Sequence, residues 1–228
     1  DLDTKRLDIF GRVMHDLNVS ALRGAGEDWR LRLQGREVEG SAVWGGPAPA
    51  APNGKLTARL SRFAPPEAGE LRPLRSEASP DEPTRNTWPQ LDIVATAFVS
   101  RGHDLGRFEL QAQPAGPDWR IETMTLANPA GRIEANGWWR IGRDTQMTEI
   151  DARVTAEDAG AFLQRLGYPV AVLNAPTTIE GALAWKGAPN AFDYPTLSGK
   201  FNLATGAGQF TRIDPGIGKL LGVLSLQA

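Results

Sequence analysis

Short segments in which apolar and polar residues alternate with period two recur along most of this chain. In residues 29–34, Trp29, Leu31 and Leu33 alternate with arginines and a glutamine. Because successive side chains of a β-strand point to opposite faces, such a segment is predicted to form a strand with one apolar and one polar face. The same alternation occurs in residues 56–60, 91–97, 133–139, 150–154, 179–185 and 197–203.

Turn signals separate these segments at intervals of about ten residues. They include Gly24-Ala25-Gly26, Gly116-Pro117-Asp118, Asn128-Pro129-Ala130-Gly131 and Gly187-Ala188-Pro189-Asn190. This spacing is typical of antiparallel meanders, sandwiches and barrels, whereas βαβ units need longer connections. The sequence therefore predicts a mainly β, antiparallel fold.

A repeat relates the two halves of the chain. The sequence His-Asp-Leu begins at His15 and again at His103, and Asp-Trp-Arg follows at Asp28 and at Asp118, 90 residues apart. In each copy a later strand ends in tryptophan, and a looser third copy ends at Trp185. Such repetition predicts a supersecondary unit in which each copy extends the sheet of its neighbour.

Two helices are predicted among the strands. The first covers residues 155–167, with Thr155 as its N-cap and Gly167 at its end. The second covers residues 214–226, where Asp214-Pro215 supplies a cap and a first-turn proline before leucines at helical spacing.

Loops divide the chain into three parts. Residues 45–53 are predicted to be a loop, and residues 64–90 carry six prolines among charged residues, which predicts a mobile or inserted loop. We therefore expect an N-terminal β repeat in residues 1–63, this proline-rich loop, and a C-terminal β repeat in residues 91–228, with one continuous sheet running through both repeats.

Composition excludes several classes of protein. The net charge of −2 with dispersed basic residues argues against nucleic acid as a partner, since phosphate binding needs a basic face. The absence of cysteine removes thiolate catalysis and cysteine-ligated metal. The longest apolar run, residues 220–226, is far shorter than the roughly 20 residues that span a bilayer. Because the sequence opens on Asp1 without methionine, we interpret it as a piece of a longer protein.

The candidate catalytic residues are few. His15 and His103 each precede an aspartate, but neighbouring strand residues point to opposite faces, so we expect turn or surface roles rather than a triad or a zinc site. Glu37 and Glu39 are predicted to share a strand face, which we interpret as a solvated strand edge rather than a paired-carboxylate hydrolase site. We expect no catalytic residue set, no cofactor and no metal.

Two further patterns have a functional and a structural interpretation. Gly216-Ile217-Gly218-Lys219 resembles a phosphate cradle only faintly, because leucine follows the lysine where a P-loop needs serine or threonine. The seven tryptophans are candidates for a sugar-binding platform. Their placement at strand starts and strand ends favours a structural role at the ends of an apolar face.

Several motifs resemble the C-terminal part of the YhdP family of AsmA-like proteins. They are residues 118–122 (DWRIE), 136–139 (NGWW), 158–168 (DAGAFLQRLGY), 181–185 (GALAW), 197–201 (LSGKF) and, most specifically, 218–227 (GKLLGVLSLQ). The resemblance runs from about Trp88 to Ala228, and residues 1–63 resemble the preceding repeat of that family.

The resemblance implies an envelope protein of Gram-negative bacteria. Such a protein is anchored to the inner membrane by an N-terminal helix, and its long periplasmic β-structure curls into a groove that carries phospholipid towards the outer membrane. The implied fold is an extended, strongly curved antiparallel sheet that forms an open groove, a half-barrel with one or two short helices. The implied partners are phospholipids and the two membranes, and the implied activity is not enzymatic.

The apolar strand positions supply candidate residues for contact with lipid tails. Tails need a continuous apolar lining and no polar code. Taken by strand parity, these positions are Leu31, Leu33, Val38, Leu56, Leu60, Ile93, Phe108, Leu110, Ile121, Ile133, Ile150, Val154, Ile179, Leu183, Leu197, Phe201 and Leu203. A bulge in any strand would move this assignment to the other face. The alternative is a structural or assembly module, a β-sandwich of the bacterial envelope whose apolar faces form a closed core.

Overall fold

A single large β-sheet dominates the computed structural model of this chain. The structure describes residues 2–9, 12–24, 26, 28–65, 88–142, 145–169, 172–189 and 191–210. Within these ranges there are one twelve-stranded sheet, one two-stranded sheet, one α-helix and one short 3-10 helix. The chain is therefore mainly β, as the alternation predicts.

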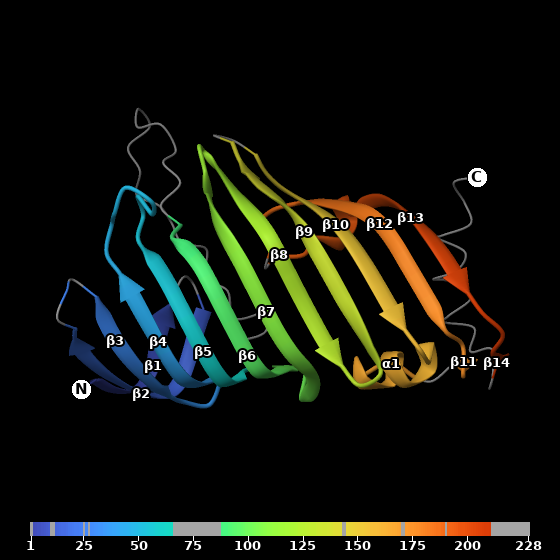
Figure 1. The fold of residues 1–228 in the computed structure, drawn as a ribbon, viewed down its shortest axis with the longest axis horizontal. Coiled ribbons are helices and arrows are strands. Elements are labelled where there is room, and N and C mark those ends of the chain that lie inside the picture. The colour runs from blue at the N-terminus through green and yellow to red at the C-terminus, as the bar shows by residue number, and fades with distance from the viewer. Residues whose placement is uncertain are drawn as a thin grey trace.

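The strands follow one another across the large sheet almost in chain order (Figure 1). The first six are β1 (Leu2–Ile9), β2 (Arg12–Arg23), β3 (Trp29–Gln34), β4 (Val38–Gly45), β5 (Lys55–Phe63) and β6 (Gln90–Ser100). The next six are β7 (His103–Ala115), β8 (Asp118–Asn128), β9 (Gly131–Ile141), β10 (Gln146–Ala156), β12 (Thr177–Lys186) and β13 (Ser198–Thr205). The small sheet pairs β11 (Val172–Leu173) with β14 (Gln209–Phe210).

One pair of neighbouring strands departs from the antiparallel prediction. β5 and β6 pair in parallel, with Ala58 opposite Ile93, whereas the other neighbours in the large sheet pair antiparallel. A parallel partner requires the chain to return to the edge of the sheet where the first strand began, which takes a connection of about a dozen residues or more. Residues 64–89 provide that length, so the sheet is mixed.

The large sheet is open and curved. β1 and β13 are its two edges and do not pair with each other, so the sheet does not close into a barrel. In Figure 1 the N-terminal strands β1 and β2 lie deeper than β3 to β5, which shows the curl of the sheet at that end. The predicted open, curved groove is therefore the observed fold, and within the described residues no second large sheet lies against the first.

The helix begins later than the sequence indicates. Strand β10 continues to Ala156, and α1 covers only Ala159–Arg165. Its N-cap is Asp158, whose carboxylate accepts hydrogen bonds from the backbone N–H groups of Gly160 and Ala161. Thr155 is a strand residue paired with Arg132 and Thr178. The assignment of Thr155 as N-cap was wrong because two strand ladders hold that residue extended.

Some predicted features lie outside the described residues. They are the helix at residues 214–226, the motif from Gly216 to Lys219, the most specific family motif at residues 218–227, and residues 66–87 of the proline-rich loop. The predicted loop at residues 45–53 is observed between β4 and β5 and contains a bridge between Ala48 and Ala51.

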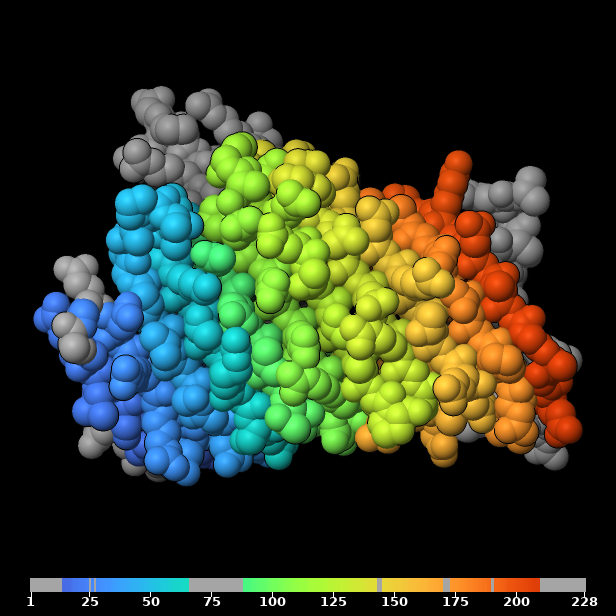
Figure 2. Space-filling view, viewed as in Figure 1, coloured from blue at the N-terminus to red at the C-terminus, as the bar shows by residue number. Residues whose placement is uncertain are grey.

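The buried side chains gather on one face of the sheet in two clusters. One cluster contains Leu17, Val38 and Ala95, from β2, β4 and β6. The other contains Ile121, Ile150 and three tryptophans, from β8 to β12. Figure 2 shows the strands as adjacent bands that follow one another across the molecule. The core of this protein is therefore a layer that lies along one face of one sheet.

Candidate functional site: the apolar inner face

The register of the strands defines a continuous apolar face, here called the inner face. Residues directly opposite each other on neighbouring strands share a face. One such row runs Ile121, Gly137, Ile150, Leu183 and Gly199 through β8, β9, β10, β12 and β13. The inner face is the one that carries this row and the two buried clusters, and the opposite face is the outer face.

Sixteen of the seventeen candidate lipid-contacting residues lie in strands, with side chains on the inner face. They are Leu31, Leu33, Val38, Leu56, Leu60, Ile93, Phe108, Leu110, Ile121, Ile133, Ile150, Val154, Ile179, Leu183, Phe201 and Leu203. Leu197 precedes β13 and stands outside the ladder. The structure brings the strand residues together on one surface, and their contact with lipid stays a prediction.

Bulges shift the alternation of inner and outer side chains, so a strict period of two assigns residues beyond a bulge to the wrong face. The register of β8 against β9 changes between Ile121 and Met124. As a result Met124 and Leu126 lie on the inner face, three and five residues after Ile121, and Phe98 follows Ala95 in the same way in β6. The signal was present in the sequence, since the apolar residues themselves move by one position at each bulge.

Small residues occupy the middle of the inner face. Alanines lie there at positions 42, 58, 95, 112, 135 and 152, and glycines at 137, 181 and 199. A Cβ atom added at Gly137 would collide with the carbonyl oxygen of Glu149, and one added at Gly181 would collide with that of Lys200. The backbones approach so closely there that only glycine fits.

The inner face is buried at its centre although the described residues hold no second large sheet to cover it. Ala95 is 0% exposed and Ile121 is 3% exposed. Curvature explains this burial, because it turns the inner side chains of separate strands towards one another. At the C-terminal edge the same face is open: Phe201 is 41% and Leu203 52% exposed.

Tryptophans form one rim of the inner face, here called the aromatic rim. Trp29 lies opposite Trp44, and Trp119 opposite Trp139, at matching positions of the two repeats. Trp185 on β12 lies in the same row, because Thr148 on β10 is opposite both Trp139 and Trp185. The rings of Trp119 and Trp139 are 6.4 Å apart, edge to face, so they pack against each other rather than offering free platforms for sugars.

Two of these indoles tether chain segments over the aromatic rim. The Nε1 of Trp119 donates a hydrogen bond to the carbonyl of Pro89, at 3.1 Å, and the Nε1 of Trp185 donates one to the carbonyl of Ala188, at 3.2 Å. The Nε1 of Trp139 is buried and has no hydrogen-bond partner in the described part of the chain. The tryptophans thus close one rim of the groove with segments from before β6 and after β12.

The indoles of Trp119 and Trp139 differ in what their removal leaves unpaired. Trp119→Phe leaves the buried carbonyl of Pro89 without a donor, whereas Trp139→Phe removes an indole N–H that has no acceptor. We expect Trp119→Phe to lower the free energy of unfolding by about 1 kcal/mol more than Trp139→Phe. Urea unfolding of the two variants measures this difference, and equal losses would contradict the tethering role of Trp119.

Helix α1 lies at the opposite ends of the strands. Phe162 is 4% exposed and packs so closely over Gly131 that a Cβ atom added there would be 2.7 Å from its ring. Gly167, with φ of +85°, ends the helix beside the ring of His103. The helix therefore contacts the ends of β7 and β9 and limits the inner face on this side.

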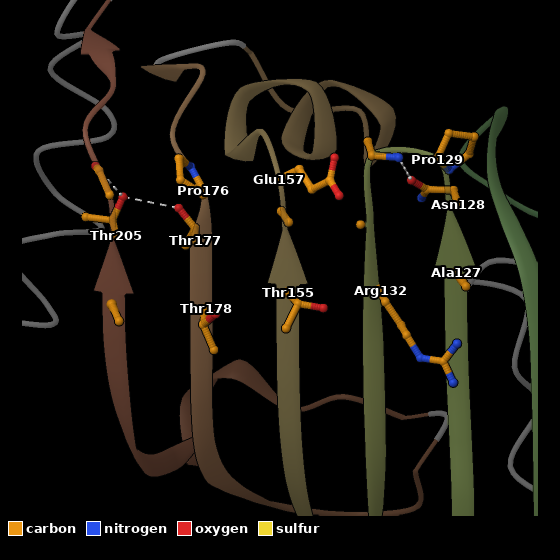
Figure 3. Close-up of a pocket in the computed structure, with 15 residues that line it drawn as sticks. Ala127, Asn128, Pro129, Arg132, Thr155, Glu157, Pro176, Thr177, Thr178 and Thr205 are labelled. Atoms are coloured by element: carbon orange, nitrogen blue, oxygen red, sulfur yellow. Dashed lines mark hydrogen bonds between the residues drawn. The ribbon is translucent and has the colours of Figure 1, made fainter.

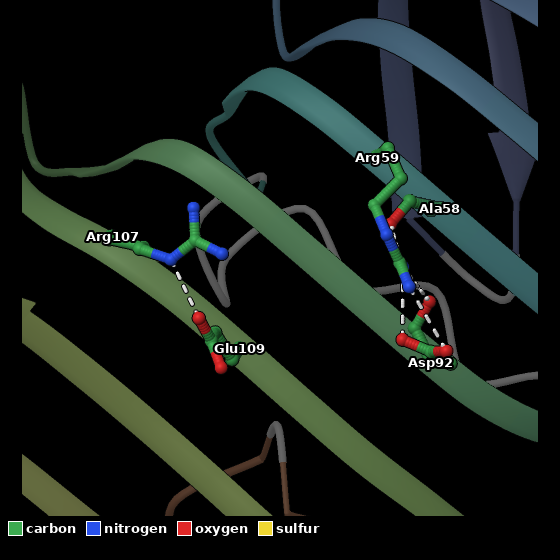
Figure 4. A network of polar contacts seen from close by, with 5 residues as sticks. All are labelled: Ala58, Arg59, Asp92, Arg107 and Glu109. Carbon is green, nitrogen blue, oxygen red and sulfur yellow. Dashed lines mark hydrogen bonds and ion pairs between the residues drawn. The ribbon is translucent and has the colours of Figure 1, made fainter.

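The outer face is lined by charged side chains in ion pairs (Figure 4). Arg59 binds Asp92 through both η nitrogens, at 2.9 and 3.1 Å, and Arg107 binds Glu109 at 2.6 Å. Arg140 binds Asp118 at 2.9 Å, and this hydrogen bond raises the pKa of the guanidinium. Exposed pairs of this kind contribute little stability, about 0 to 1 kcal/mol each. These charged side chains make the outer face hydrophilic.

The remaining candidate chemical residues are engaged in structure. The Nδ1–H of His15 donates a hydrogen bond to the carboxylate of Glu37, at 2.9 Å, and the backbone N–H of His15 donates to the same carboxylate. The prediction that Glu37 and Glu39 share a strand face was wrong, because Glu37 lies in the bend before β4. The bend directs the Glu37 side chain towards His15. In the described ranges no group of three or more His, Asp or Glu residues could hold a metal ion.

Two hollows lie at the strand ends near α1. The larger, of about 810 Å³, is lined mainly by the ends of β8, β9, β10, β12 and β13 (Figure 3). The smaller, of about 510 Å³, lies beside α1. Both are lined by Pro129, Ala130 and Glu157. We call the larger one the rim pocket.

Fold and site together define a class of protein: a single curved β-sheet, built from repeats, whose inner face is apolar and whose outer face is charged. The family model described as YhdP protein matches residues 1–228, so the chain belongs to the YhdP family of AsmA-like bacterial envelope proteins. No curated protein and no solved structure was found to match it. Across the residues that the structure describes, no helix is both long and apolar enough to span a membrane.

Proposed function

We propose that this chain is part of a non-enzymatic conduit that carries phospholipid between the inner and outer membranes. Acyl chains lie along the inner face of the sheet, and the charged outer face stays in water. The protein works in the periplasm and is held to the inner membrane by an N-terminal helix, as membership of this family implies.

The observation that carries this proposal is the one-sidedness of the sheet. Away from the strand ends, inner-face positions from β3 to β13 are apolar or small apart from the buried Thr148, and the described residues include no second large sheet to cover them. The centre of this face is buried by its own side chains, and its C-terminal edge is open at Phe201 and Leu203. An exposed apolar edge of this kind indicates a ligand or a partner. A lipid tail suits it because such a tail needs shelter from water and no directional contacts.

The energetics of burial suit acyl tails. Shielding one methylene group from water contributes about 0.8 kcal/mol, so a long acyl chain gains much from a lining that is merely apolar. Since every strand adds a similar section of lining, a tail can move from one strand to the next without losing its environment. This is the property that transport along a groove requires.

The alternative was an assembly module with a closed β-sandwich core. A sandwich needs two sheets packed about 10 Å apart, face to face. The described residues form one large sheet, and the second sheet has only the two short strands β11 and β14. The arrangement therefore supports the conduit better than the sandwich.

Photo-crosslinking tests the proposal strand by strand. A photoreactive residue at Leu110 or Ile133, on the inner face, is expected to form lipid adducts in cells that contain the full-length protein. The matched controls are Arg107 and Glu134, which lie in the same two strands on the outer face. Mass spectrometry of the purified protein detects the adducts. Equal adduct yields on both faces, or none on the inner face, would refute the conduit.

A further inference from the structure

The aromatic rim is covered in the C-terminal repeat and uncovered in the N-terminal one. Trp119 is 5% exposed, and the ring of Trp88, from the segment before β6, packs against it with 6.1 Å between the ring centroids. Trp29 is at the matching position of β3, at the N-terminal end of the sheet (Figure 1), and is 43% exposed. In the described part of the chain, its Nε1 has no hydrogen-bond partner. The N-terminal repeat therefore presents a free indole to solvent.

The covered indoles show which group this rim binds. The Nε1 of Trp119 donates to the carbonyl oxygen of Pro89, and the Nε1 of Trp185 donates to that of Ala188. In both cases a neutral carbonyl meets an indole N–H at the edge of the apolar face, which suits the indole because it is apolar except at that one donor. An ester carbonyl joined to an acyl chain has the same combination of one acceptor and an apolar neighbour.

An unpaired guanidinium accompanies the uncovered indole. Arg23 lies directly opposite Trp29 in the ladder of β2 and β3, so the two side chains share a face. Arg23 is exposed and, among the described residues, has no ion-pair partner. In the other repeat the residue opposite Trp119 is Pro114. The uncovered indole thus has a cation beside it where the covered one has an apolar residue, and arginine binds phosphate oxygens through charge-assisted hydrogen bonds.

Trp44 and Asp28 define the two sides of this surface. Trp44 lies opposite Trp29 on β4, and its ring is held close to the loop between β4 and β5, since a Cβ atom added at Gly54 would be 2.7 Å from it. The carboxylate of Asp28 lies towards the outer face, where its Oδ1 would be 3.4 Å from a Cβ atom added at Gly45. Asp28 is therefore turned away from the two rings.

The same face becomes wholly apolar towards the centre of the sheet. Leu31 and Leu33 follow Trp29 at two-residue steps of about 7 Å along β3, are half-buried, and pack against the cluster that contains Leu17. The order from the centre to the strand end is therefore aliphatic side chains, an indole N–H and a guanidinium. A glycerophospholipid has the same order: acyl chain, ester carbonyl and phosphate. Tryptophan and arginine are arranged in this way where membranes meet water.

We propose that the open rim, made of Arg23, Trp29 and Trp44, holds the glycerol end of a phospholipid at the edge of the groove. The guanidinium of Arg23 donates to the phosphate, the Nε1 of Trp29 donates to an ester carbonyl, and the acyl chain lies over Leu31. The open rim is on the inner face and at the strand ends opposite to the rim pocket. This inference rests on the proposed lipid-carrying function and adds the polar contacts that hold the lipid.

Ester and ether lipids test the contact of Trp29. The purified chain is incubated with vesicles that contain equal amounts of ester-linked phosphatidylglycerol and of its ether-linked analogue, which lacks the carbonyl groups, and mass spectrometry identifies the retained lipid. We expect a preference of about threefold for the ester lipid, which Trp29→Phe abolishes. Trp138→Phe is the matched control and should leave the preference unchanged, because this indole lies on the outer face beside Arg120 and Arg140.

Removal of the phosphate tests the contact of Arg23. With phosphatidylglycerol and diacylglycerol of identical acyl chains, we expect the chain to prefer the phospholipid by only about threefold, because the guanidinium is exposed to solvent. Arg23→Gln should remove this preference, and Arg30→Gln, which changes an exposed arginine on the outer face of β3, should not. Either preference surviving its variant, or retention without preference, overturns the open-rim site and leaves the conduit standing. A chain that retains no lipid overturns the conduit and this inference with it.

A short-chain lipid tests the site without vesicles. Dihexanoyl phosphatidylglycerol, kept below the concentration at which it forms micelles, is titrated into the isotope-labelled chain, and the indole N–H signals are followed by NMR, with Trp29→Phe to assign the signal of Trp29. That signal is expected to shift, whereas the signal of Trp119 should stay, because Trp119 is already bonded to Pro89. Equal shifts with inorganic phosphate show a simple anion site and refute the ester contact. No shift with the lipid refutes the open rim as a lipid site.

Discussion

Leu183→Asp is expected to lower the phospholipid retained by the purified chain by about tenfold or more. Leu183 lies in the middle of the inner face, opposite Ile150 and Gly199, and is packed against the buried cluster of β8 to β12. A carboxylate there removes apolar contact from a tail and must also be desolvated when a tail covers it. Both effects oppose binding, and lipid extraction followed by mass spectrometry measures the loss.

The neighbouring residue provides the matched control for that substitution. Ala182 lies in the same strand on the outer face and is exposed, so Ala182→Asp adds the same charge without touching the inner face. It should leave lipid retention unchanged. Ala152→Trp, which fills the middle of the inner face without a charge, should also reduce retention. Unchanged lipid content in folded Leu183→Asp and Ala152→Trp chains would show that tails do not lie there.

Gly137→Ala is expected to destabilise the fold by about 2 to 3 kcal/mol, more than most single substitutions. The added Cβ atom would collide with the carbonyl oxygen of Glu149 on β10 and lie 2.9 Å from the side chain of Ile150. Backbone cannot yield as a flexible side chain can, so β9 and β10 must separate. Urea unfolding followed by tryptophan fluorescence measures the loss, because Trp139 lies two residues away.

Gly46→Ala is the control for this substitution. Gly46 lies just after β4, and a Cβ atom there would have no neighbour within 4 Å. Its replacement should change the free energy of unfolding by less than about 0.5 kcal/mol. If both variants lose similar stability, the close approach of β9 and β10 at Gly137 is not what requires glycine.

Much of the site could be predicted because it depends on local periodicity. The alternation of Leu31 and Leu33 with arginines predicts which side of β3 is apolar, whatever the neighbouring strands are. The same holds for Ile179 and Leu183 in β12. The repeat of Asp-Trp-Arg predicts that Trp29 and Trp119 occupy equivalent positions, and each is paired with a tryptophan of the next strand.

Other features depend on contacts that no local pattern contains. The bulge in β8 moves Met124 and Leu126 to the inner face because the ladder to β9 changes register there. Thr155 remains in a strand because Arg132 and Thr178 hold it on both sides, so the helix begins after Asp158. Glu37 turns to His15 because β2 runs beside it.

Side-chain direction alternates in every strand whatever its partners are, so the pattern along the chain was enough to predict repeated strands with one apolar face. Strand pairing was needed to show that these faces form one continuous surface on an open sheet, that β5 and β6 run parallel, and that Arg132 and Glu157 line the same pocket. Those properties arise from pairing between distant strands and from curvature accumulated over twelve of them, and neither is contained in any single segment.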